Sequence, residues 1–104
     1  MLAAVISRFG PPDVLEIRDV PTPAPGPDEV LVRVHASSLN RADLAQRLGR
    51  YPAPPGWPAD IPGLEFAGQV AATGSDARRW HAGDRVFGLV GGGAHAEYAV
   101  VHEA

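Results

Sequence analysis

The stretch that decides the fold runs from Val30 to Leu44 and reads VLVRVHASSLNRADL. Apolar side chains occupy every second position from Val30 to Ala36, and this period of two predicts a strand with one buried face. The pattern then changes: Asn40 is a good helix N-cap, Asp43 lies in the first turn where an acid favours the helix dipole, and Gly49 is a natural stop. The sequence therefore predicts a strand that leads into a short helix through a polar junction.

Shorter patterns on both sides of this unit also predict strands. The expected strands cover residues 3–7, 14–20, 66–72, 85–90 and 94–101, and the first two should form a hairpin. Proline prevents regular structure in 21–27 and in the loop 51–62, which contains five prolines and Trp57. The sum predicts a mainly β fold, a partly open β-barrel with one or more short helices, rather than an α/β sheet.

Length and composition exclude several classes of protein. A chain of 104 residues is the size of one domain, so residues 1–104 are expected to form a single unit. There is no cysteine, which excludes disulfides, thiolate-bound zinc and a cysteine nucleophile. The formal net charge of −3 and the lack of an apolar run of about 20 residues argue against nucleic-acid and membrane partners. We therefore expect a cytoplasmic protein.

Two apparent motifs lack the surrounding sequence that their function requires. The segment Gly91–Ala96 matches the dinucleotide fingerprint G-x-G-x-x-A, but a strand pattern follows it instead of the helix that must receive the pyrophosphate. Among the four histidines, only His95 shares a strand face with a nearby acid, Glu97, and no third ligand follows. We predict neither a nucleotide fingerprint nor a metal site.

The remaining polar candidates have ordinary explanations when each is taken alone. Ser37, Ser38 and Ser75 lack the strand–turn–helix context of a nucleophilic serine. Asn40 would usually be only a cap, and Tyr51 only a half-buried ring with its hydroxyl in water. Glu65 stands between Leu64 and Phe66, so it should pair with an arginine or a backbone donor. The residue types alone leave the function open.

Taken in order, six motifs resemble one known family. They are Val30–Val34, Ala36–Asp43, Gly49–Pro52, Pro62–Gly68, Gly83–Val86 and Gly92–Tyr98. This order resembles the N-terminal GroES-like catalytic domain of the medium-chain dehydrogenases/reductases, and most closely the zinc-free, zeta-crystallin-type quinone oxidoreductases. The resemblance covers essentially the whole chain. In the zinc enzymes of that superfamily, ligands stand at the positions of Asn40 and Leu64, and these two side chains cannot replace a thiolate and an imidazole on zinc.

The resemblance implies an NADPH-dependent enzyme that passes hydride, without a metal, to a quinone or another conjugated carbonyl. Asn40 and Tyr51 are the implied catalytic and cofactor-binding residues. Asn40 matches the position that contacts the nicotinamide end and the substrate oxygen, where its amide can donate to a developing negative charge. Tyr51 matches a pocket tyrosine, whose hydroxyl keeps its proton at neutral pH. Trp57 is a further candidate for the wall of an apolar pocket.

The family also implies what lies outside these residues. Its members bind NADPH mainly through a Rossmann domain that is absent from residues 1–104, and the full-length enzyme is expected to be a homodimer. We therefore expect the 104-residue chain alone to be inactive. Two alternatives stay open: an enoyl or 2-alkenal reductase of the same superfamily, and a non-catalytic GroES-like binding or assembly module.

Overall fold

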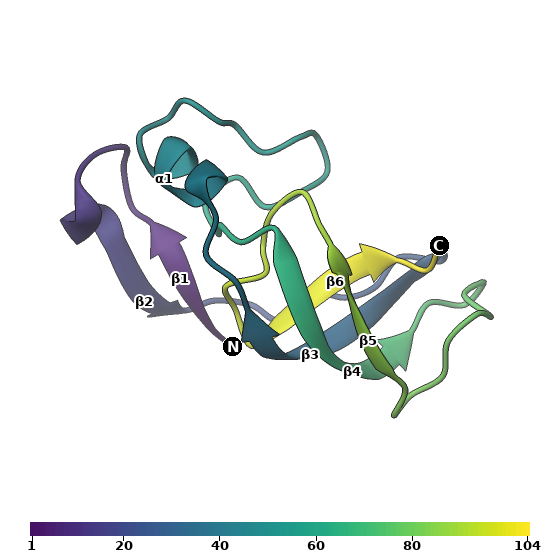
Figure 1. Ribbon diagram of the computed structural model, residues 1–104. Helices are drawn as coiled ribbons and strands as arrows, with labels where there is room; N and C mark the ends of the chain where they lie inside the picture. Colours follow the sequence, from purple (N-terminus) through teal and green to yellow (C-terminus); the bar gives the residue numbers. More distant parts are fainter.

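The central element of the computed structural model, which describes residues 1–104, is the strand β3 (Glu29–Ser37) (Figure 1). It pairs antiparallel with β4 (Glu65–Thr73) on one side and with β6 (Tyr98–His102) on the other. A further strand, β5 (Arg85–Leu89), pairs with the outer side of β4. The larger sheet therefore has the order β5-β4-β3-β6 and is open at both edges.

The core lies on one face of this sheet. The alternation predicted from Val30 to Ala36 does not extend to Ala36, which is exposed beyond a shift in strand register. It is confirmed at the start of the strand, because Val30 and Val32 are fully buried. Around them pack four further buried residues, Phe66, Val70, Val90 and Ala94. Burying small β-branched side chains on one strand face is what a period-two pattern requires. The apolar face of β3 therefore holds the sheet together.

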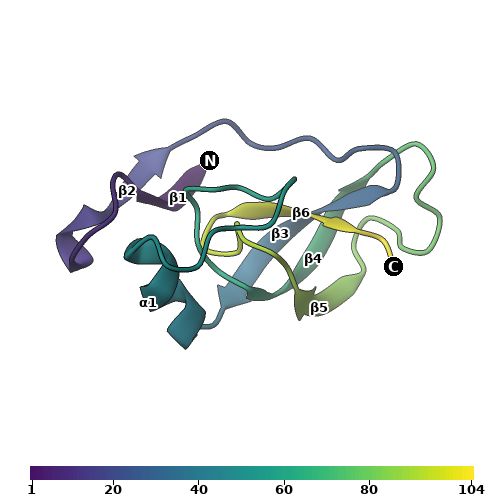
Figure 2. The ribbon, with the colours of Figure 1, turned by 90° about the horizontal axis from the view of Figure 1, so that it is seen from above.

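The N-terminal strands form a separate hairpin, as predicted. Strand β1 (Leu2–Ile6) pairs antiparallel with β2 (Leu15–Asp19), and a short 3₁₀ turn (Pro12–Val14) connects them. A bridge between Ala3 and Ala96 links the hairpin to the rest of the molecule, together with further backbone hydrogen bonds such as the one from Ile6 N–H to the carbonyl oxygen of Asp60. Figure 2 shows the hairpin and the single α-helix at one end of the molecule, beyond the four-stranded sheet.

The predicted fold class is confirmed: the chain is mainly β, with two sheets that do not close into a full barrel. The one α-helix, α1 (Arg41–Arg47), begins directly after Asn40, as expected. No helix in the structure is both long enough and apolar enough to cross a lipid bilayer.

The last predicted strand begins later than the sequence suggested. Residues 94–97 are not part of a continuous strand, and β6 starts only at Tyr98. The glycines before it explain the difference, because Gly93 has a φ of +91° and turns the chain away from the extended path. No helix follows these glycines, so the rejection of the dinucleotide fingerprint is confirmed.

The helix α1 exposes the apolar face that the sequence gives it. Leu44 and Leu48, four positions apart, are both exposed, and Gln46 is instead the buried residue of the helix. The amide nitrogen of Gln46 has no hydrogen-bond partner. Burial of the leucines therefore does not hold α1 in place, and its N-terminal polar contacts gain importance.

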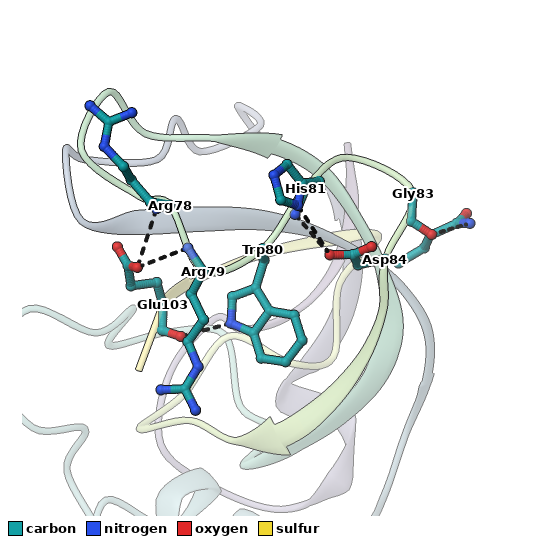
Figure 3. A network of polar contacts seen from close by, with 8 residues as sticks. Arg78, Arg79, Trp80, His81, Gly83, Asp84 and Glu103 are labelled. Carbon is teal, nitrogen blue, oxygen red and sulfur yellow. Dashed lines mark hydrogen bonds and ion pairs between the residues drawn. The ribbon is translucent and has the colours of Figure 1, made fainter.

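The C-terminal end of the chain is tied to the segment between β4 and β5 (Figure 3). Trp80 donates its indole N–H to the main-chain oxygen of Glu103 at 2.7 Å. The Glu103 side chain accepts the backbone N–H groups of Arg78 and Arg79, at 3.3 and 3.2 Å. Next to this network, Asp84 accepts the backbone N–H of His81 at 2.8 Å. These bonds hold the ends of β4, β5 and β6 together at the side opposite the helix.

A close backbone approach between β3 and β4 depends on one glycine. A Cβ atom at Gly68 would lie 2.1 Å from the carbonyl oxygen of Arg33 and 2.9 Å from a methyl group of Val32. The pairing of the two strands shifts register beside this point, between Val34 and Ala36. A bulge of this kind bends the strand and redirects the side chains that follow. Gly68 therefore helps to set the direction in which β3 enters the polar junction.

We predict that Gly68→Ala lowers the free energy of unfolding by about 1–3 kcal/mol, because the methyl group must displace the backbone of β3. Gly88→Ala is the matched control: it lies in the next strand, where an added Cβ would meet only Phe66 at 3.5 Å. Its effect should stay within about 0.5 kcal/mol. Urea unfolding of both variants checks this, and equal stabilities would contradict the close approach.

Candidate functional site

The candidate site is built on the turn between β3 and α1. Asn40 has an extended backbone, with φ −131° and ψ 157°, and occupies the N-cap of the helix. Asp43 reaches back from the first turn, and its Oδ2 accepts the main-chain N–H of Asn40 at 3.1 Å. The two residues have a capping-box arrangement, in which the hydrogen bond from the Asn40 backbone to the Asp43 carboxylate has good geometry. The turn therefore has a fixed shape.

The carboxamide of Asn40 has no well-formed bond to the helix. It makes no side-chain capping hydrogen bond, and its Nδ2 is enclosed without a partner. The Oδ1 atom of Asp43 is enclosed and unpartnered as well. An enclosed polar group without a partner costs about 1–3 kcal/mol, so the junction holds one donor and one acceptor that the domain itself leaves unsatisfied. Asn40 therefore occupies the predicted N-cap position, but the side chain that accepts the hydrogen bond there is that of Asp43.

His95 connects the junction to the glycine-rich segment before β6. Its Nε2 lies 3.0 Å from Asp43 Oδ2, and its Nδ1 lies 2.7 Å from Ser37 Oγ. The His95 and Asp43 side chains are only 14% and 11% exposed. Since Asp43 accepts from Asn40 as well, one carboxylate oxygen holds both the turn and the imidazole. The result is a continuous chain of contacts from the end of β3 to the start of α1.

Gly63 allows the segment that contains His95 to pack closely against the backbone before β4. It has a φ of +113°, and a Cβ there would lie 2.6 Å from the main-chain nitrogen of His95. That nitrogen donates to the carbonyl oxygen of Pro62 at 3.0 Å. A positive φ and a backbone contact of this kind both require glycine. The backbone therefore fixes His95 independently of its ring contacts.

An open, mostly apolar groove lies beside the junction. Its volume is about 560 Å³, and Phe87 and Leu89 of the edge strand β5 supply much of its apolar wall, being 87% and 73% exposed. Its other lining includes Ala36, Ser37, Ser38, Glu65 and Phe66. The groove is shallow and wide enough for a flat apolar molecule.

Glu65 has a different partner from the one expected. Ser38 donates its hydroxyl to Glu65 Oε2 at 2.5 Å, and no arginine pairs with the carboxylate. Ser38 directly follows the last residue of β3, and Glu65 is the first residue of β4, which pairs with β3 here. The Ser38 proton is thereby committed to Glu65, whereas Ser37 contacts the imidazole of His95.

The structure does not place the two predicted site residues in one cavity. Tyr51 is 43% exposed in the loop after α1, and no hydrogen bond is formed by its hydroxyl. Neither Asn40 nor Tyr51 lines the large groove. Trp57 lines a different cavity of about 250 Å³, where its ring packs against Gly91. Within these residues, the loop 51–62 does not reach the groove beside Ser37.

Sequence reasoning missed the role of Ser37, Asp43 and His95 as a group. Asp43 was interpreted as a helix-dipole acid, and the two other residues were considered only as a nucleophile and a metal ligand. His95 lies 52 residues from Asp43 and 58 from Ser37, so no local spacing joins them. The only signal was a histidine two residues after a run of glycines, which permits close backbone approach. No set of three or more His, Asp or Glu side chains in the structure is close enough together to bind a metal ion.

The fold and the motifs agree with one family. Residues 26–104 match the alcohol dehydrogenase GroES-like domain. The chain is 47% identical over 98 residues to a quinone oxidoreductase of Pseudomonas aeruginosa, a match that covers 93% of this chain and 30% of that protein. The chain belongs to the family of alcohol dehydrogenase GroES-like domains, and it spans about a third of the length of such relatives.

Solved structures support the same assignment. The quinone oxidoreductase of Pseudomonas syringae pv. tomato DC3000 superposes with a TM-score of 0.88 at 41% identity, covering 99% of this chain and 32% of that one. A 2-haloacrylate reductase superposes with a TM-score of 0.85 at 28% identity, covering 99% of this chain and 30% of that one. The recognised resemblance to the GroES-like part of quinone oxidoreductases is confirmed.

We predict that Asp43→Ala lowers the free energy of unfolding by about 1.5–3 kcal/mol, because it removes the acceptor of both Asn40 and His95 from an enclosed position. Asp43→Asn keeps one acceptor oxygen and should cost less. Asp84→Ala, which also removes a carboxylate bonded to a backbone N–H, is an exposed comparison. Chemical denaturation measures all three, and an Asp43→Ala protein as stable as the wild type would contradict the role of this carboxylate.

Proposed function

We propose that residues 1–104 are the N-terminal catalytic domain of an NADPH-dependent quinone oxidoreductase that acts without a metal. The name and the fold of the most similar proteins support the reaction class. The chain corresponds to about a third of such an enzyme. In this proposal a Rossmann domain in the rest of the protein binds most of the cofactor, and the present chain provides one wall of the site.

The observation that carries the proposal is the unpartnered amide of Asn40. When bound, NADPH supplies the hydride for the reduction of a conjugated carbonyl. The residues of this chain fit such a reaction, because Asn40 Nδ2 is a donor without a partner at a rigid turn. An amide donor stabilises a developing oxyanion without becoming ionised, and its effect is largest when its direction is fixed in advance. The bond from Asp43 to the Asn40 backbone provides this rigidity.

Two further features favour a flat and apolar substrate. The groove beside Ser37 presents Phe87 and Leu89 to its interior, and its floor is formed in part by Phe66. A quinone or an enone would bury apolar surface there and still offer an oxygen to the polar junction. In this proposal Tyr51, with an exposed ring and a free hydroxyl, acts from the loop after α1 and outside the groove.

The metal-free character is part of the proposal and follows from side-chain chemistry. Leu64 has no donor atom, and the amide of Asn40 is a poor ligand for zinc compared with a thiolate or an imidazole. Neither residue belongs to a group of His, Asp or Glu side chains that a metal could bridge. In this proposal the site polarises the substrate by hydrogen bonds.

A reductase for 2-alkenals or related conjugated substrates is the second candidate. The likeness to a 2-haloacrylate reductase favours it, because that name describes an activated carbon–carbon double bond. Comparison of 1,4-benzoquinone with a 2-alkenal as substrates of the full-length protein separates the two. Turnover of neither substrate would favour a non-catalytic GroES-like module.

We predict that Asn40→Ser in the full-length enzyme lowers kcat for 1,4-benzoquinone about 100-fold, the size of effect seen when one oxyanion donor is removed. Serine keeps N-cap character, so the free energy of unfolding should stay close to that of the wild type. Tyr51→Phe should lower kcat or raise KM, again without loss of stability. Steady-state NADPH oxidation and thermal unfolding measure these effects, and unchanged kinetics in both variants would contradict the assignment.

A further inference from the structure

The contacts around His95 form a hydrogen-bonded path that has no part in the function proposed above. Ser37 lies at the end of this path and lines the groove, so its hydroxyl is open to a bound molecule. Behind it, His95 Nδ1 is 2.7 Å from Ser37 Oγ, and His95 Nε2 is 3.0 Å from Asp43 Oδ2. The path thus begins at an exposed hydroxyl and ends at an enclosed carboxylate.

The position of the protons on His95 follows from its partners. A carboxylate can only accept, so His95 Nε2 carries a hydrogen that it donates to Asp43. This leaves Nδ1 to accept from the Ser37 hydroxyl when the ring is neutral, or to donate to it when the ring is protonated. Both charge states keep the same two contacts, so a proton can pass between Ser37 and His95 without movement of the ring.

The side chains that face His95 are compatible with proton transfer through its ring. From α1 the facing group is the Asp43 carboxylate, and from β3 it is the neutral Ser37 hydroxyl. Glu97, two residues further along the chain, directs Oε1 to the backbone N–H of Leu2. The neighbouring Ser38 cannot take the place of Ser37, because its hydroxyl donates to Glu65.

We propose that Ser37 and His95 form a proton relay that delivers a proton to the reduced substrate, with Asp43 as the residue that positions His95. The relay rests on the proposed function, which supplies a substrate whose oxygen becomes negatively charged after it accepts a hydride. Ser37 is the catalytic residue of the relay, because it lines the groove and would touch the substrate oxygen. A histidine suits the second position, because one ring nitrogen can stay bonded to Asp43 while the other gives or accepts a proton.

The proton balance of the step is simple. A bound nicotinamide cofactor would supply the hydride and its two electrons, and the substrate oxygen would then carry the negative charge that the relay neutralises. The O–H bond of Ser37 breaks as a new O–H bond forms on the substrate, and the Nδ1–H bond of His95 breaks to restore the Ser37 hydroxyl. His95 then takes a proton from water at Nδ1. Throughout, Nε2–H stays bonded to Asp43, which remains a carboxylate.

The first experiment measures kcat and KM of the full-length enzyme with NADPH and 1,4-benzoquinone. Ser37→Ala and His95→Gln should each lower kcat about 100-fold or more, which is the lower end of what general acids contribute, with little change in KM. Ser37→Thr keeps a hydroxyl and should restore most of the rate. His35→Gln is the matched control, because it removes another histidine next to the same strand end and should leave kcat unchanged. Full activity of Ser37→Ala, or failure of Ser37→Thr to recover activity that Ser37→Ala loses, would overturn the relay.

The second experiment reads the proton directly and does not depend on turnover. In the ¹⁵N NMR spectrum of the full-length protein, assigned with the His95→Gln variant, neutral His95 should carry its hydrogen on Nε2. In Asp43→Asn the ring should lose this fixed preference. A wild-type His95 with its hydrogen on Nδ1, or with both forms in rapid exchange, would overturn the proposal.

The two experiments distinguish the failure of the relay from the failure of the proposed function. Quinone turnover that survives Ser37→Ala unchanged would refute the relay and leave the proposed function in place. A wild-type enzyme that shows the Nε2–H form but does not oxidise NADPH with 1,4-benzoquinone would refute the proposed function, and would remove the reaction that the relay serves.

Discussion

The contact between Asp43 and His95 is the interaction on which the polar end of this domain depends. Its 3.0 Å distance joins the first turn of α1 to the glycine-rich segment before β6, 52 residues further along the chain. The same carboxylate oxygen holds the backbone of Asn40. Because Leu44 and Leu48 are not buried, α1 has little apolar packing to fix its start. A carboxylate at 11% exposure with two donors is well suited to that task.

Backbone geometry prepares this contact from both sides. Gly68 lets β4 come close to the backbone of β3 where the pairing shifts register, and Gly63 lets the His95 segment come close to the residues before β4. Glycine is required at both positions, because a Cβ atom there would overlap the neighbouring backbone. The apolar face of β3 then supplies the burial that holds the sheet. The close-packed backbone therefore positions the segments that meet at the polar junction and the groove.

The sequence predicted the strands, the start of the helix and the fold class because their signals are local. The alternation from Val30, the cap position at Asn40 and the proline-rich segments each act within a few residues. The site was harder to predict because its contacts are distant: nothing near His95 in the sequence indicates Asp43 or Ser37. Glu65 was expected to meet an arginine or a backbone donor, yet its partner is the hydroxyl of Ser38, the residue directly after β3. The late start of β6 followed from glycine φ angles, which the period of the side chains does not encode.

The most direct test of this account is a double-mutant cycle between Asp43 and His95. The free energies of unfolding of Asp43→Ala, His95→Ala and the double variant, each compared with the wild type, give the coupling of the two side chains. The account predicts a coupling of at least about 1 kcal/mol, as expected for residues in one hydrogen-bonded network. Strictly additive effects of the two substitutions would contradict it.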